Sequence, residues 1–232
     1  MRNIIVMIIL LVFAAGCSDS TGPEEKASLK VYTTMTSSTV RQSFDKGNDP
    51  TVLAERVDSL HIDRVRILVS RLKLKALNGP ERDVKSGPFV LTGDSTFGEF
   101  MLTSGEIPPG EYEAVKFEFH RFSGSELEFF RNDAVFGDFA TGDRWTAIID
   151  GEYFEDGAAI PFVFRRAFTA NLSINLRQPV SVAADEELDI ILEIDPREVF
   201  MDAGWPLNPD SPDNGNIIEK NIKDAIKANK RN

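Results

Sequence analysis

Residues Gly105–Phe122, GEIPPGEYEAVKFEFHRF, contain the clearest fold signal in the chain. Pro108 and Pro109 lack the amide hydrogen that a strand ladder needs, and Gly110 frees the backbone to turn. After them, apolar valine and phenylalanine alternate with charged lysine and glutamate, which is typical of a strand with one buried face. We therefore expect a turn that leads into an antiparallel core strand.

The alternation continues on both sides of this stretch. Between Leu60 and Leu74 its parity shifts twice, which predicts two β-bulges or bends within one long strand. Further strand-like runs cover residues 29–34, 89–91, 98–102, 145–154, 160–168, 172–176 and 188–194. With short connections throughout, the pattern predicts an all-β fold, an antiparallel β-sandwich of about eight or nine strands.

Near the C-terminus the apolar period changes from two to that of a helix. Ile218, Ile222, Ala225 and Ile226 recur at helical spacing. We expect a short amphipathic C-terminal helix that packs on the sandwich. A helix that binds a partner is the alternative.

The N-terminal residues predict where the protein resides. Arg2 precedes an apolar run of about a dozen residues, shorter than the roughly 20 that span a bilayer as a helix, and small residues then lead to Cys17. The sequence AAGC resembles the lipobox of bacterial lipoproteins, which implies cleavage after residue 16 and acylation of Cys17. An ordinary secretory signal that leaves a free thiol is the alternative.

This interpretation divides the chain into three parts. Residues 1–16 are the signal peptide, residues 17–27 are a flexible tether, and residues 28–232 form one β-sandwich domain with its C-terminal helix. Because acyl chains insert into lipid, the expected site is the bacterial cell envelope with the membrane as partner. No aspartate directly follows Cys17, which favours the outer membrane.

Composition excludes some partners. The formal net charge of -11 argues against nucleic acid and anionic lipid surfaces, and it suits cations or a neutral ligand such as a glycan. The single cysteine leaves no intramolecular disulfide and no CxxC metal site.

Four segments together resemble a family of bacterial lipoproteins of unknown function with a transthyretin-like or carbohydrate-binding-like β-sandwich. They are VDSLHIDRVRILVSRLKLKA, GEIPPGEYEAVKFEFHRF, LDIILEIDPREVF and NIIEKNIKDAIK. These motifs consist of turn and core residues, so the resemblance implies a fold. It implies no binding residue at any position of this chain.

Several side chains are candidates for binding. A glycan platform needs exposed aromatic rings, and the candidates are Trp145, Tyr153 and Trp205, with the Phe129–Phe130 pair; packing in the core is the alternative. A polar loop at the end of the first predicted strand offers Ser37, Ser38, Thr39, Asp45, Asn48 and Asp49. Loops at strand ends often carry binding residues, although a plain surface loop is the alternative.

Calcium is the best-motivated cofactor, because it prefers oxygen ligands. The candidate ligands are Asp210, Asp213 and Asn216, in a segment that also contains Asn208 and Asn214. A second candidate group is Asp133, Asp138 and Asp143. In both segments, solvated turns capped by these side chains are the alternative.

The sequence favours a protein that is not an enzyme. His61 and His120 are its two histidines, and no GxSxG, HExxH, P-loop or GxGxxG motif is present. We expect a non-catalytic binding or structural module for a glycan or an envelope protein. The alternatives are an extracytoplasmic hydrolase that uses carboxylates and an adhesin-like subunit that exchanges the strand KVYTT, residues 30–34.

Overall fold

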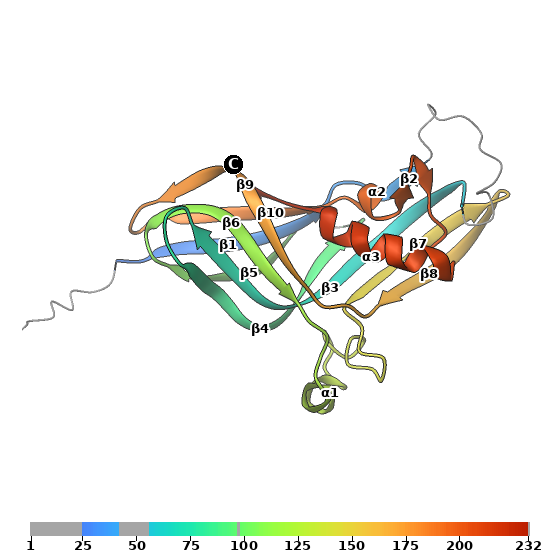
Figure 1. The fold of residues 1–232 in the computed structure, drawn as a ribbon, viewed down its shortest axis with the longest axis horizontal. Helices are drawn as coiled ribbons and strands as arrows, with labels where there is room; N and C mark the ends of the chain where they lie inside the picture. The colour runs from blue at the N-terminus through green and yellow to red at the C-terminus, as the bar shows by residue number, and fades with distance from the viewer. Residues whose placement is uncertain (1–24, 42–55, 97, 232) are drawn as a thin grey trace, which may run out of the picture.

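The structure is a computed structural model that describes residues 25–41, 56–96 and 98–231. Two β-sheets pack against each other, and helices cover the part of the larger sheet that extends beyond the smaller one (Figure 1). This arrangement confirms the predicted all-β sandwich. All nine predicted strands are present, and the described residues add four more, β2, β11, β12 and β13.

The larger sheet contains seven strands. They are β2 (Thr39–Arg41), β3 (Ser59–Ala76), β4 (Glu81–Asp94), β6 (Gly110–Phe119), β7 (Ala147–Glu155), β8 (Ala158–Arg166) and β9 (Ala170–Val182). β3 is the centre of the sheet, because β7 and then β6 pair along one of its edges, while β2 and then β4 pair along the other.

The two parity shifts predicted in β3 are real irregularities. The register against β7 shifts between Ile62 and Arg64, and the register against β4 and β6 shifts between Val69 and Arg71. Each shift restores the apolar side chains to the core face, since a slip of one residue turns the next side chain to the opposite face. The bulges therefore keep this 18-residue strand in one sheet.

The smaller sheet has the order β13, β10, β1, β5. Its strands are β1 (Ala27–Met35), β5 (Glu99–Ile107), β10 (Glu187–Ile194) and β13 (Ile226–Lys230). The expectation of antiparallel neighbours throughout is wrong here, because β1 and β10 pair in parallel. Parallel strands need a long crossover, and all seven strands of the larger sheet lie between these two strands in the sequence.

The remaining elements are short. They are α1 (Gly124–Phe130), α2 (Pro196–Val199), β11 (Met201–Asp202), β12 (Trp205–Pro206), η2 (Pro212–Asn214) and α3 (Gly215–Asp224). Ile218 and Ile222 of α3 are buried in the main core, as the helical spacing predicts. α3 is thus the predicted short helix near the C-terminus.

The chain does not end in that helix. The carbonyl of Ala225 accepts a hydrogen bond from the amide of Asp195 at 3.1 Å, a bond that takes the place of the next helical turn. Ile226, predicted as part of the helix, instead begins β13, which pairs with β10. The open edge of β10 therefore determines the conformation of this segment.

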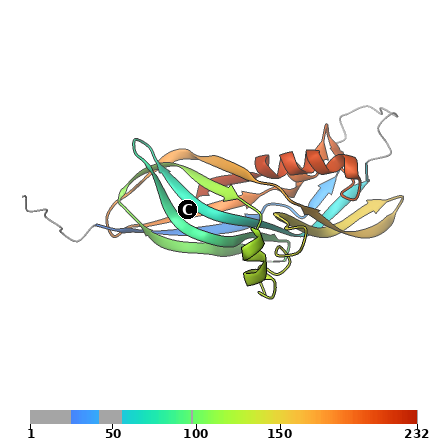
Figure 2. The same cartoon turned by 60° about the horizontal axis from the view of Figure 1, so that its bottom comes forward.

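A lobe of residues 123–143, here called the α1 lobe, projects from the larger sheet between β6 and β7 (Figures 1 and 2). The sequence of this segment predicts a loop, yet the segment contains α1. The start of α1 is stabilised by a hydrogen bond from the Ser123 amide to the Glu126 carboxylate at 2.8 Å. The lobe covers a second apolar cluster of Leu68, Phe122, Phe139, Ala140 and Ile148.

Candidate functional site

A polar pocket lies where β1 ends, beside the turn between β4 and β5. Its volume is about 470 Å³. It is lined by Met35, Thr36, Ser37, Ser38, Asp94, Ser95, Thr96 and Gly98. Ser37 and Ser38 belong to the polar loop that the sequence marks as a binding candidate, whereas Asp45, Asn48 and Asp49 lie outside the described residues.

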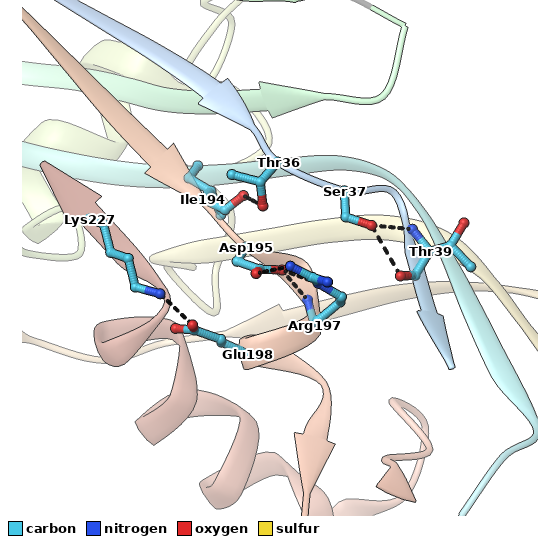
Figure 3. Close-up of polar contacts among 8 residues, drawn as sticks. All are labelled: Thr36, Ser37, Thr39, Ile194, Asp195, Arg197, Glu198 and Lys227. Carbon is cyan, nitrogen blue, oxygen red and sulfur yellow. Dashed lines mark hydrogen bonds and ion pairs between the residues drawn. The ribbon is translucent and has the colours of Figure 1, made fainter. Parts of the chain in front are cut away.

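The first wall of the pocket is the end of β1. The amide and the hydroxyl of Thr36 both donate to the carbonyl of Ile194, at 3.0 and 3.5 Å (Figure 3). The hydroxyl of Ser37 accepts from the Thr39 amide at 3.2 Å, which closes a small turn. The Ser38 carbonyl accepts from the Ile62 amide at 2.6 Å, so this wall is tied to both sheets.

The second wall is the turn after β4. Asp94 Oδ1 accepts hydrogen bonds from the amide and the hydroxyl of Thr96, at 2.8 and 2.6 Å. The Ser95 amide donates to the Asp63 carbonyl at 2.9 Å. The sequence DST between two strands is a signature of such a turn, but nothing in the sequence shows that it faces Ser37 and Ser38.

Charged groups fix the end of β10, which holds Thr36. Asp195 accepts from the backbone amide of Arg197 at 3.0 Å and from its guanidinium at 3.0 and 2.8 Å (Figure 3). Burial alone raises the pKa of this carboxyl, but the hydrogen bonds from Arg197 outweigh that effect and the pKa is lowered. An ion pair with Glu198 raises the pKa of Lys227 on the adjacent β13.

The chemistry of the lining suits a ligand with many hydroxyl groups. Five of the lining side chains are serine or threonine, which both donate and accept hydrogen bonds. The hydroxyls of Ser38 and Ser95 make no hydrogen bond with any described residue. Asp94 is the single carboxylate among the lining residues, whereas glycosidases use two.

The three predicted glycan-contact aromatics lie elsewhere. Tyr153, on β7, is 7% exposed, and burial and the nearby Asp210 carboxylate raise the pKa of its phenol. Trp145 precedes β7 and packs against the cluster under the α1 lobe. Trp205, on β12, is half-buried with the Arg56 guanidinium 4.6 Å from its ring centre. None of the three lines the pocket; Trp145 lies just before the start of β7, and Tyr153 lies near its end.

The predicted calcium ligands lie in and directly beside η2. Asp210 and Asp213 are exposed, and the side-chain oxygen of Asn216 accepts a hydrogen bond from the guanidinium of Arg166. Over residues 25–41, 56–96 and 98–231, no group of three or more His, Cys, Asp or Glu side chains could hold a metal ion. A calcium site here stays a prediction without a geometric argument.

In the second candidate calcium group, Asp133 and Asp138 form hydrogen bonds or an ion pair within the protein. Asp138 pairs with Arg66 at 2.6 Å, which ties the α1 lobe to β3. Asp133 accepts from the amides of Val135 and Phe136 at 2.8 and 3.0 Å, while Asp143 is exposed. These contacts match the alternative of capped turns.

The two histidines are not brought together. His61 is on the first half of β3, 3.6 Å from the carboxylate of Asp63. His120 follows the end of β6, which pairs with the second half of β3. Two histidines on neighbouring strands can share a metal ion or a proton, but His61 and His120 lie at different halves of β3, so their positions give such a site no support.

No protein-family model, curated protein or solved structure matches the chain. The likeness to envelope lipoproteins stays a prediction from the quoted motifs. Cys17 and residues 1–24 lie outside the described residues. In the part of the chain that is described, no helix is long and apolar enough to cross a membrane.

Proposed function

We propose that this chain is a lipid-anchored protein of the bacterial outer membrane whose β-sandwich binds a neutral glycan and catalyses no reaction. The observation that supports the glycan ligand is the pocket lined by five hydroxyl side chains and one carboxylate. A sugar presents donors and acceptors in the same mixture, so each hydroxyl of the pocket can exchange a bond to water for a bond to the ligand.

Charge favours a neutral sugar over an acidic one. The chain carries a formal net charge of -11, and Asp94 adds a carboxylate to the lining. Each neutral hydrogen bond contributes about 0.5–1.5 kcal/mol net, so a few of them correspond to a Kd on the order of 1 mM for a small sugar. We expect affinity to grow with the number of sugar units that the site contacts.

The other two functions receive less support from the geometry. A carboxylate hydrolase needs a second acid opposite Asp94, and the lining residues offer none. Strand exchange needs β1 to leave the sheet, yet β1 pairs with β10 on one side and β5 on the other. Its removal would break two ladders and expose Leu29 and Val31, which are fully buried.

The glycan proposal is tested by titrating the protein with neutral oligosaccharides and with sialylated ones, using calorimetry. We expect binding of a neutral oligosaccharide, with affinity about 3- to 10-fold weaker for Ser38→Ala and for Ser95→Ala, the range that one lost hydrogen bond gives. EDTA should leave the affinity unchanged, because one lining carboxylate cannot hold calcium alone.

The matched control is Ser104→Ala, an exposed serine of β5 outside the pocket. It should bind the glycan as the unaltered protein does. Binding of no neutral glycan, or an equal loss in the control, would contradict the proposal.

A further inference from the structure

Another polar pocket lies along one side of the sandwich, where the last strands of the two sheets meet. β9 is the edge strand of the larger sheet and β13 that of the smaller one; they lie side by side, and no ladder joins them among the described residues. The pocket between them has a volume of about 510 Å³, within the range of small-molecule sites. We call it the β9–β13 pocket, and its polar lining residues are Arg177, Gln178, Ser181, Asn229 and Lys230.

An irregularity of β9 forms one wall of this pocket. The register of β9 against β6 is interrupted at residues 176–179, which together stand opposite Glu113 alone. Pro179 lies in this bulge and has no amide hydrogen for a ladder. Bulges re-aim side chains, and the two long polar side chains of this one, Arg177 and Gln178, are exposed and line the pocket.

The two cations of the pocket have no acidic partner in the described part of the chain. Arg177 and Lys230 are exposed, and neither side chain forms an ion pair or a hydrogen bond with any described residue. Glu113, the acid opposite the bulge, pairs with Lys75 at 2.5 Å instead. The pocket therefore holds two positive charges that the protein itself does not neutralise.

A smaller pocket of about 280 Å³, on the outer face of β6 and β9, shows the contrast. It is lined by Lys73 and Lys116, but Lys73 lies 2.9 Å from Glu118, and Lys116 pairs with Glu81. Both of these acids line the same pocket, so its lysines are neutralised within the protein. None of the described residues that line the β9–β13 pocket is acidic.

Neutral donors complete the lining. The side-chain amides of Gln178 and Asn229 form no hydrogen bond with any described residue, and each amide can donate to an anion or accept from a hydroxyl. The hydroxyl of Ser181 is occupied, because it donates to the carboxylate of Glu111 at 3.0 Å. That carboxylate disfavours an anion at its own edge of the pocket, so an anion is expected beside the two cations.

We propose that the β9–β13 pocket binds a phosphate monoester of a hydroxylated compound. A phosphate monoester carries a charge of about −1.5 to −2 at pH 7, which matches two cations, whereas a carboxylate carries a single charge. The guanidinium of Arg177 binds two phosphate oxygens as a fork, and Lys230 adds a point charge. The acids elsewhere on the surface weaken this attraction little, because salt screens charges beyond about 8 Å at physiological ionic strength.

The probes are glycerol 1-phosphate, glycerate and glycerol, each titrated by calorimetry into the full chain in detergent. Glycerol 1-phosphate should bind at least tenfold more tightly than glycerate, and glycerol should not bind. Equal binding of glycerol 1-phosphate and glycerate would overturn the preference for a phosphate monoester.

A lipid headgroup can present the same phosphate, so a second arm uses phosphatidylcholine vesicles with and without phosphatidic acid, whose phosphate is a monoester. The full chain with Cys17→Ser is sedimented with them. Binding of vesicles only when they contain phosphatidic acid, without binding of glycerol 1-phosphate, assigns the phosphate to a lipid. Binding of glycerol 1-phosphate assigns it to a soluble compound, and binding of neither probe would overturn the proposal.

Variants locate the site. Arg177→Gln and Lys230→Gln should each weaken binding of the phosphate probe about tenfold, because hydrogen bonds to charged groups are the stronger class. The matched control is Lys220→Gln, the same change at an exposed lysine of α3 outside the pocket, and it should bind as the unaltered protein does. All three side chains are exposed, so folding should survive, which circular dichroism checks. An equal loss for Lys220→Gln would show attraction by net charge alone and would overturn the site.

This site is independent of the proposed glycan site, because the two pockets share no residue. Ser38→Ala, which should weaken glycan binding, should leave binding of the phosphate probe unchanged. Weaker phosphate binding in Ser38→Ala would place the phosphate in the hydroxyl-lined pocket and contradict the β9–β13 site.

Discussion

Two threonines that are both completely buried have opposite hydrogen-bonding states. Thr146 donates its hydroxyl to the carbonyl of Phe168 at 2.6 Å and accepts from the amide of the same residue at 3.1 Å. The hydroxyl of Thr33, on the core face of β1, has no hydrogen-bond partner among the described residues. An unpaired polar group in a core costs about 1–3 kcal/mol, so the two residues contribute to stability in opposite directions.

Thr33→Val should raise the free energy of unfolding by about 1 kcal/mol, because valine keeps the shape and removes the unpaired hydroxyl. Thr146→Val should lower it by about 1–3 kcal/mol, because it leaves both backbone groups of Phe168 without a partner. Urea denaturation measures both values. A Thr33→Val protein less stable than the unaltered one would contradict the assignment.

The sequence identifies some residues of the pocket but not all of them. Ser37 and Ser38 follow a recognisable strand, which is why they were identifiable, but Ser95 reaches the same pocket from another strand. Tyr153 shares the parity of Ile149 on β7, and both are buried, so alternation contained the signal that it faces the core. Aromatic identity alone does not separate an exposed ring from a packed one.

At the scale of elements, local pattern predicts strands well and their ends less well. The nine strands and the bulges of β3 follow from alternation, because the core selects one face. The five-residue β13 and the parallel pairing of β1 with β10 depend on which edge is open after the rest has folded. No window of sequence contains that information.

The junction of β10 and α2 predicts a pH dependence. The lowered pKa of Asp195 means that its ionised form stabilises the folded state above the unfolded pKa of about 3.9. The pKa of Asp195 in the folded protein lies below the unfolded pKa, and this stabilisation is lost as the pH falls through that lower pKa. Asp195→Asn keeps the helix cap but removes the charge.

We therefore expect Asp195→Asn to be about 1 kcal/mol less stable than the unaltered protein at pH 7, a modest value because Arg197 is 58% exposed and screened by solvent. The difference should shrink as the pH falls below about 4. Asp213→Asn, at an exposed carboxylate on η2, serves as the control and should show no such change. A difference for Asp195→Asn that is constant with pH would show that its charge is not involved.

At the scale of the whole molecule, β1 connects the proposed anchor to the proposed site. It begins at Ala27, ten residues after Cys17, and runs for nine residues to Met35 at the pocket. Nine strand residues span about 30 Å. If the chain is anchored at Cys17, the pocket lies at the end of β1 that is farther along the chain from the lipid, where a glycan can reach it.

Cys17→Ser tests the anchor. Acyl chains contribute about 0.8 kcal/mol per buried methylene, so the unaltered protein should partition with membranes until detergent is added. The variant should appear in the soluble fraction after cell disruption. A variant that stays with the membrane would contradict lipid anchoring through this residue.

The glycan site is tested most directly by amide NMR of the Cys17→Ser protein during titration with the neutral oligosaccharide that binds it. We predict that the largest shift changes fall on Thr36–Ser38 and Ser95–Thr96, from the two walls of the pocket, and that Trp145, Tyr153 and Trp205 change little. Largest changes at those three aromatics, or no change with any neutral glycan, would contradict binding in this pocket.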